Sequence, residues 1–205
     1  NVEQGLKTAK LAFGGIEPYA TPRRLALIVK ELAAEQSDRI EKRRGPALNV
    51  AFDQSGRPTR AAEGFAHSCG IAVTDLGRLK TDDGEWLAYD LRIDGRSSVD
   101  VLPGIVSEAL ASLPVSKRMR WGEHSFEFVR PVHWLVMLYG ARVVECEILG
   151  LAAGRVTYGH RFHHPDSIEL QHPDDYAAEL EKTGRVIPGF AKRRDHIRSL
   201  IETCV

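Results

Sequence analysis

A short turn between two strand-like segments constrains the fold of this chain more than any other feature. Residues 79–93 are typical of two strands, and Asp83-Gly84 lies between them. An Asp-Gly pair is typical of a two-residue hairpin turn, which can join only antiparallel strands. Elsewhere, helix-like and strand-like segments mix without a regular strand–helix–strand order. The sequence therefore predicts an α+β fold in which a mixed, mainly antiparallel sheet is flanked by helices.

Apolar residues at helical or strand spacing locate the other elements. The first expected helix ends at Gly14-Gly15, and Pro114 ends the third. A charged connection is expected over residues 37–46. The expected helices cover 2–13, 59–70, 101–113, 174–182 and 190–205, and the expected strands are 25–29, two within 79–93 and three within 126–151.

A shift in composition at Leu113-Pro114 predicts the boundary between two lobes. The first lobe would cover residues 1–113, and the second would cover 114–205 and end in a truncated helical segment. Both ends of the chain have a helical pattern, which is expected of a fragment of a longer protein.

The composition is that of an ordinary globular protein without bulk affinity for polyanions. Lys and Arg total 28, Asp and Glu total 28, and the formal net charge is zero. Any contact with nucleic acid must therefore come from one face. The widely spaced Cys69, Cys146 and Cys204 favour a reduced, cytoplasmic protein. The longest apolar run, 134–139, is too short to span a membrane.

Positive charge and large flat rings concentrate in residues 113–134, LPVSKRMRWGEHSFEFVRPVHW. Arginine offers a planar set of donors to phosphate, and tryptophan can stack on a base, so this pattern is typical of a nucleic-acid contact. The alternative is a solvated loop whose Trp121 is anchored in the core. The residues that carry the pattern are Lys117, Arg118, Arg120, Trp121, Arg130 and Trp134.

Two further basic segments are candidates for the same chemistry. Arg23 and Arg24 follow Pro22 at the start of an expected strand, where they can reach phosphate or form salt bridges. Arg43 and Arg44 lie in the charged connection, and acidic neighbours there favour a solvated face.

Histidines gather in the segment GHRFHHP, which begins at residue 159. His160, His163, His164 and Asp166 allow the hypothesis of a metal-dependent hydrolase, but no HExxH motif or cysteine pair accompanies them. His160 and Arg161 also suit a phosphate contact. No GxSxG, GxxxxGK[ST] or GxGxxG motif is present, so the sequence identifies no catalytic residue and no ATP site.

An ordered set of motifs extends across most of the chain: TPRRLA, RRGP, AAEGFA, GEWL, LPVSKRMRWG, FVRPVHWLV, ILGL and GRVTYGHRFHHP. Together these motifs resemble the β subunit of bacterial two-subunit glycyl-tRNA synthetase. The resemblance implies an N-terminal region of β within an α2β2 tetramer that joins glycine to tRNA(Gly). It also implies that the α subunit catalyses the reaction with ATP and Mg²⁺, so no cofactor, metal or catalytic residue is assigned to this segment.

Two roles for this region follow as competing hypotheses. It binds tRNA through basic and aromatic side chains, or it is a purely structural assembly module in which those arginines pair with carboxylates. An open basic groove would favour tRNA, whereas burial of Trp121 and acidic partners for Arg118 would favour assembly. The candidate tRNA-binding residues are Lys117, Arg118, Arg120, Trp121 and Arg130, followed by Arg23, Arg24, Arg43, Arg44, His160 and Arg161.

Overall fold

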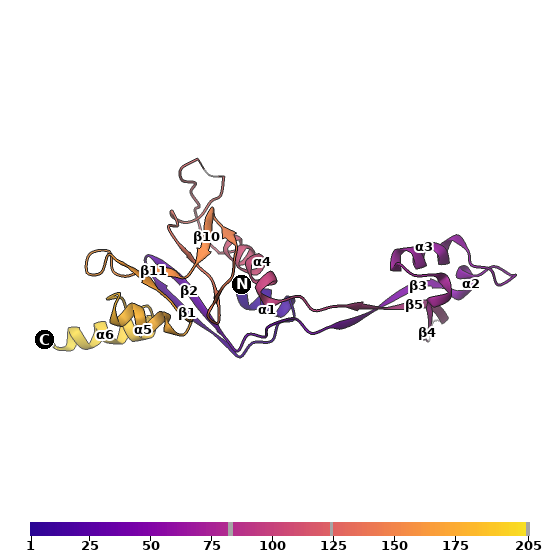
Figure 1. Ribbon diagram of the computed structural model, residues 1–205, viewed down its shortest axis with the longest axis horizontal. Coiled ribbons are helices and arrows are strands. Elements are labelled where there is room, and N and C mark those ends of the chain that lie inside the picture. Colours follow the sequence, from indigo (N-terminus) through magenta and orange to yellow (C-terminus); the bar gives the residue numbers. More distant parts are fainter. Residues whose placement is uncertain (82–83, 124, 204–205) are drawn as a thin grey trace. The chain divides into compact units, whose positions relative to one another are not determined.

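The computed structural model describes residues 1–81, 84–123 and 125–203, and the chain divides into two compact units (Figure 1). The second unit is Ser37–Gly95, and the first contains the chain on either side of it. Leu113 and Pro114, where the sequence predicts a lobe boundary, both lie in the first unit. Helices and mainly antiparallel strands occur in both units, so the predicted α+β class is confirmed.

A β-hairpin lies at the centre of the candidate site in the first unit. Strands β1 (Gly15–Thr21) and β2 (Arg24–Lys30) pair antiparallel along their whole length. A two-residue turn, Pro22-Arg23, joins them. The predicted strand 25–29 is thus confirmed as β2. The turn before it places Arg23 and Arg24 at the tip of the hairpin.

The two faces of this hairpin have different surroundings, because side chains alternate along a strand. On one face, Ile28 is buried in a core with Leu170 and Leu180. On the opposite face, Leu25 is 63% exposed and Leu27 is 41% exposed. The hairpin therefore carries an apolar outer surface that no described residue covers completely.

Helix α1 (Val2–Thr8) is shorter than the predicted helix 2–13. Lys10 adopts a φ of 56°, and the Leu11 N–H donates to the Leu6 carbonyl at 3.0 Å. This is the Schellman pattern of a helix end, with lysine in the left-handed position where glycine is usual. Leu11 is only 3% exposed. Because Leu11 packs into the core, the helix ends before the glycine pair.

Helix α4 (Ser98–Ala111) corresponds to the helix predicted at 101–113, and it packs against α1. The approach is close, because a Cβ added to Gly5 would lie 2.6 Å from Ile105 Cγ2. This packing forms the largest core of the first unit, whose buried members are Leu6, Leu11, Leu102, Ile105, Met137, Val144 and Ile148.

The predicted strands within 126–151 are shorter and more interrupted than expected. Phe128 takes part only in an isolated bridge with Met119. β10 pairs parallel with β6 and antiparallel with β9, whereas β7 with β8 and β11 with β12 form antiparallel pairs. The strands are β6 (Leu135–Val136), β7 (Leu138–Tyr139), β8 (Arg142–Val143), β9 (Glu147–Ile148), β10 (Leu151–Gly154), β11 (Val156–Tyr158) and β12 (Ser167–Glu169).

Two helices complete the first unit. α5 (Asp175–Lys182) and α6 (Phe190–Thr203) confirm the helices predicted near the end of the chain, and Cys204 lies outside the described residues. Ile197, Leu200 and Ile201 of α6 are each more than half exposed. No helix in the described part of the chain is long and apolar enough to cross a membrane.

The second unit is a three-stranded antiparallel sheet with helices packed against it. The strand order is β3-β5-β4, and the buried residues Ala51, Ala62 and Leu87 form its core. The predicted hairpin is confirmed by the pairing of β4 with β5. Gly84 belongs to β5 and lies opposite Thr81, and residues 82–83 between the two strands lie outside the described residues. The elements are β3 (Arg39–Ala47), α2 (Leu48–Ala51), α3 (Arg60–Cys69), η1 (Val73–Asp75), β4 (Gly77–Thr81) and β5 (Gly84–Ile93).

Strand β3 replaces the connection that was predicted at residues 37–46, so that prediction is wrong. β3 pairs with β5 from Arg39 opposite Ile93 to Ala47 opposite Trp86. It is an edge strand, and its first six residues are all exposed. Charged side chains are common on edge strands because they discourage further strand pairing, so charge alone was a poor sign of a connection.

Candidate nucleic-acid interface

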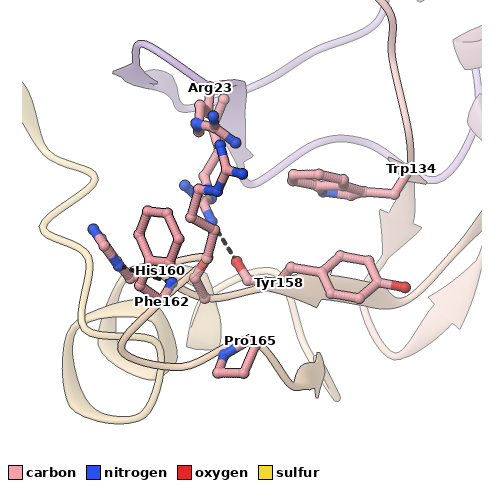
Figure 2. Close-up of a pocket in the computed structure, with 9 residues that line it drawn as sticks. Arg23, Trp134, Tyr158, His160, Phe162 and Pro165 are labelled. Atoms are coloured by element: carbon pink, nitrogen blue, oxygen red, sulfur yellow. Dashed lines mark hydrogen bonds between the residues drawn. The ribbon is translucent and has the colours of Figure 1, made fainter.

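A cavity of about 520 Å³ opens at the tip of the β1–β2 hairpin in the first unit (Figure 2). Its wall comes from four places: the hairpin turn, the segment before β6, the end of β11 and the loop after β11. We call it the hairpin-tip cavity. Its lining residues are Arg23, Arg24, Trp134, Tyr158, Gly159, His160, Arg161, Phe162 and Pro165.

Arg24 joins the hairpin to the loop that follows β11. Its Nη2 donates to the Tyr158 carbonyl at 2.6 Å and to the Gly159 carbonyl at 2.5 Å. Burial lowers the pKa of Arg24, and the positive charge of Arg23 adds to this effect. A guanidinium nevertheless stays charged in proteins. The loop is therefore held by a cation that faces backbone carbonyls.

The Arg24 guanidinium also keeps an unused donor. Its Nε is buried and has no hydrogen-bond partner among the described residues. A buried donor without an acceptor is costly, because water can no longer satisfy it. An oxygen that enters the cavity beside this atom would relieve that cost.

The loop after β11 owes its path to a glycine. A Cβ added to Gly159 would lie 2.7 Å from His164 Cδ2 and 2.8 Å from the Gly184 carbonyl oxygen. The next residue is fixed as well, because the His160 N–H donates to the Gly184 carbonyl at 2.7 Å. Only glycine allows the loop to pass this close to the segment that follows α5.

His160 orders the loop from within. Its Nδ1 accepts hydrogen bonds from the Phe162 N–H at 3.3 Å and the His163 N–H at 3.2 Å. Because Nδ1 acts as an acceptor, the neutral imidazole carries its proton on Nε2. The Nε2–H donor of this ring makes no hydrogen bond to the backbone of the described residues.

The charge of the cavity is positive and has no acidic counterpart in the wall. Three of the nine lining residues are arginines, and none is Asp or Glu. Among the described residues, no carboxylate lies within 4.0 Å of the nitrogens of Arg23, Arg24 or Arg161. Uncompensated guanidinium groups at a concave surface favour an anion, above all a phosphate.

Aromatic rings stand on two sides of the cavity. Figure 2 shows Trp134 and Tyr158 on one side and His160 and Phe162 on the other. Trp134 and Tyr158 meet edge to face at 5.2 Å, and the Arg24 guanidinium lies 5.8 Å from the centre of the Trp134 ring. Phe162 is 75% exposed, which is unusual for a ring of this size.

The candidates that the sequence ranked first lie in residues 117–121 and 126–130, which we call the basic segment. Their surroundings differ from those of the hairpin-tip cavity. The Nη2 of Arg118 donates to the Leu110, Ala111 and Leu113 carbonyls, at the C-terminal end of α4. Its partners are backbone carbonyls and not the carboxylates that the assembly hypothesis required. The last carbonyls of a helix have no donors within the helix, so Arg118 stabilises the C-terminal end of α4.

The rest of the basic segment is also partly occupied. Arg120 Nε lies 3.7 Å from Glu127 Oε1, and Trp121 meets Phe126 edge to face at 5.2 Å. Trp121 is half-buried and Lys117 is exposed. A smaller cavity of about 240 Å³ lies beside Arg118, but Glu127 and Glu147 belong to its wall, so it lacks the uncompensated charge of the hairpin-tip cavity.

The remaining candidates fall in two places. Arg130 Nη1 donates to the Pro22 carbonyl at 2.7 Å and so braces the hairpin turn beside the cavity. Arg43 and Arg44 belong to β3 in the second unit, where the Arg44 guanidinium lies 4.4 Å from the centre of the Trp86 ring. Within the described residues, no group of three or more His, Cys, Asp or Glu is placed to hold a metal ion.

The structure thus brings together Arg23, Arg24, His160 and Arg161, which the sequence had ranked second. Trp134, from the basic and aromatic stretch 113–134, joins them. Sequence reasoning missed Tyr158, Phe162 and Pro165. The available signal was their position, because Tyr158 and Phe162 flank the glycine, histidine and arginine of the segment YGHRF.

Comparisons with known proteins agree on one family. Residues 1–205 match the family model described as "Glycyl-tRNA synthetase beta subunit". The chain is 50% identical over 201 residues to a protein of Hahella chejuensis and 52% identical over 200 residues to one of Chromohalobacter salexigens. Both relatives are named "Glycine--tRNA ligase beta subunit". The matches cover 98% of this chain and 29% of each relative.

Proposed function

The chain belongs to the glycyl-tRNA synthetase β-subunit family, and from this premise we propose that it is a β-subunit N-terminal region that binds tRNA(Gly). The hairpin-tip cavity is the single observation that carries the proposal. It combines flat rings with arginines that lack carboxylate partners among the described residues, two features that are typical of single-stranded nucleic-acid sites.

In this proposal, tRNA binding assists a reaction that occurs on the α subunit of a cytoplasmic α2β2 enzyme. The glycine carboxylate attacks the α-phosphate of ATP to form glycyl-adenylate and releases pyrophosphate. A hydroxyl of the terminal tRNA ribose then takes the glycyl group and releases AMP. The β subunit holds the tRNA in position, which lowers the entropic barrier of the second step.

ATP and Mg²⁺ belong to the α subunit in this scheme. The wall of the hairpin-tip cavity contains no Asp or Glu to ligate a magnesium ion. The cavity therefore does not fit a magnesium–nucleotide complex, and no chemical step is assigned to it.

A second candidate function is assembly with the α subunit, and one observation favours it. Leu25 and Leu27 on the outer face of the hairpin are 63% and 41% exposed. Exposed apolar side chains that lie together are typical of protein–protein contacts. Leu25 and Leu27 alternate with Arg24 along β2, so they lie on the opposite face of the hairpin. Variants that remove arginines of the cavity leave both leucines in place and so distinguish the two functions.

The test is the double variant Arg23→Ala/Arg161→Ala in the complete enzyme. If both arginines contact phosphate, the KM for tRNA rises while kcat changes little. The slope of log affinity against log salt concentration also becomes shallower by roughly 2, about 1 for each contact. The matched control is Arg142→Ala, which removes an exposed arginine of the first unit that does not line the cavity. An unchanged KM and an unchanged salt slope would contradict tRNA binding here and leave assembly as the function.

A further inference from the structure

The size and rings of the hairpin-tip cavity restrict the form of nucleic acid that can enter it. Its volume of about 520 Å³ lies within the range of roughly 300–1,000 Å³ that is typical of small-ligand sites. A double helix keeps its base faces inside the stack, so it has no flat surface to offer a protein ring. An unpaired nucleotide exposes its base and fits such a volume.

Phe162 is the ring best placed to receive a base. It is 75% exposed, and the Arg161 guanidinium lies 4.7 Å from the centre of its ring. The backbone beneath it is fixed, because His160 Nδ1 accepts from the Phe162 N–H and the His164 N–H donates to the His160 carbonyl at 2.8 Å. An apolar ring on an ordered loop loses little conformational entropy when a base stacks on it.

Donors for the phosphate of the same nucleotide lie in the cavity wall. Arg23 stands at the hairpin turn, and Arg161 follows His160 in the loop. Figure 2 shows Arg23 on the side of the cavity opposite Pro165, with the ring of Phe162 at one flank. Charged donors and a stacking surface therefore border the same space, as a single nucleotide requires.

We infer that the hairpin-tip cavity takes one unpaired nucleotide of the tRNA, with its base against Phe162 and its phosphate against Arg23 and Arg161. The inference rests on the proposed function, since tRNA must first reach this surface. A free nucleoside monophosphate has the same chemistry, and the experiment below separates the two sources. The double-helical parts of the tRNA remain outside the cavity.

The first measurement is the affinity of the complete enzyme for tRNA when Phe162 is replaced. Phe162→Ala weakens binding roughly 5- to 150-fold, the usual effect of losing one stacked base. Phe162→Trp retains affinity, because tryptophan also offers a flat ring, whereas Phe162→Leu resembles the alanine variant. The matched control is Phe190→Ala, which removes a ring that is 66% exposed and also lies near an arginine, at 5.8 Å from Arg193.

The second measurement locates the contact. The complete enzyme bound to tRNA is irradiated with ultraviolet light and digested, and the peptide that contains Phe162 is searched by mass spectrometry for the added mass of one nucleotide. The adduct is expected with the natural protein, and its yield falls in Phe162→Ala. Adenosine monophosphate at a concentration equal to that of the tRNA leaves the adduct unchanged, whereas displacement by this compound would identify a mononucleotide site and overturn the inference.

The two proposals fail in different ways. If Phe162→Ala changes neither affinity nor adduct while Arg23→Ala/Arg161→Ala still weakens tRNA binding, a phosphate contact remains and the unpaired nucleotide is overturned. If neither variant changes tRNA binding, the proposed function itself fails. Because Phe162 is mostly exposed, its replacement leaves folding intact, and either result can be interpreted.

Discussion

The basic segment and the hairpin-tip cavity have similar compositions and different uses of their arginines. Arg118 in the basic segment donates to three carbonyls at the end of α4, and Arg120 lies beside Glu127. In the cavity, Arg23 and Arg161 have no carboxylate within 4.0 Å among the described residues. Clustered arginine and aromatic residues therefore indicate a binding site only where neighbouring groups leave the cations uncompensated.

Among the variants that test this comparison, Gly159→Ala is expected to have the largest effect on stability and on tRNA binding. The new Cβ would lie 2.8 Å from the Gly184 carbonyl oxygen, so the loop would have to move. We expect the free energy of unfolding to fall by about 1–3 kcal/mol, as for other overpacked sites. The affinity for tRNA should fall as well, because the Gly159 carbonyl accepts from Arg24.

Urea unfolding and tRNA titration would check this prediction. The matched control is Gly154→Ala, since a Cβ added to Gly154 meets no heavy atom within 4 Å. Equal stability of the two variants would show that the loop after β11 is looser than its contacts indicate.

An intermediate effect is expected from Arg118→Ala, which tests the structural side of the comparison. Loss of the donors at the end of α4 should lower the free energy of unfolding by roughly 1 kcal/mol. The KM for tRNA should stay unchanged, in contrast to Arg23→Ala/Arg161→Ala. Thermal unfolding and aminoacylation kinetics on the same preparations measure both quantities. A raised KM for tRNA without a loss of stability would mean that the basic segment contributes to tRNA binding.

The smallest effect is expected at Lys30, which lies at the end of β2 away from the hairpin turn. Lys30 Nζ lies 2.5 Å from Asp174 Oδ1 and 3.9 Å from Glu17 Oε2, and His172 Nδ1 lies 3.3 Å from Asp174 Oδ2. The hydrogen bond from Lys30 is the main cause that lowers the pKa of Asp174. A carboxylate with a lowered folded-state pKa contributes stability above its unfolded pKa and loses it as the pH falls through the folded value.

We therefore expect the free energy of unfolding to decrease as the pH falls below about 4, the usual range of Asp. Asp174→Asn should make this acid decrease slightly shallower, and Glu17→Gln serves as a control because its contact with Lys30 is longer. Urea unfolding across this pH range gives the comparison. Identical acid profiles for Asp174→Asn and the natural protein would mean that this exposed pair contributes nothing measurable.

Local signals in the sequence predicted the elements whose ends they mark. Gly70 adopts a φ of 73° and ends α3, and Pro114 follows soon after α4, both as expected. The end of α1 could not be predicted this way, because Lys10 takes the left-handed position and the burial of Leu11 decides it. Tertiary packing, and not local propensity, sets such an end.

The candidate site was predictable in its parts and not as a whole. Arg23, Arg24, His160 and Arg161 carry chemistry that is visible in the sequence. Their meeting depends on hydrogen bonds from Arg24 to carbonyls 134 and 135 residues away, which no spacing rule detects. Phe162 was missed because an isolated phenylalanine normally belongs to the core, and only the structure shows its exposure.

The closing contacts around Ser37–Gly95 have an evolutionary consequence. The Gln36 N–H donates to the Arg96 carbonyl at 2.9 Å, and Glu35 forms a bridge with Ser97. The chain thus leaves the first unit and returns to it at adjacent backbone positions. A turn of a few residues could join Gln36 to Arg96 directly. The segment Ser37–Gly95 is therefore arranged as a module that a lineage can gain, lose or exchange while the strands of the first unit keep their order.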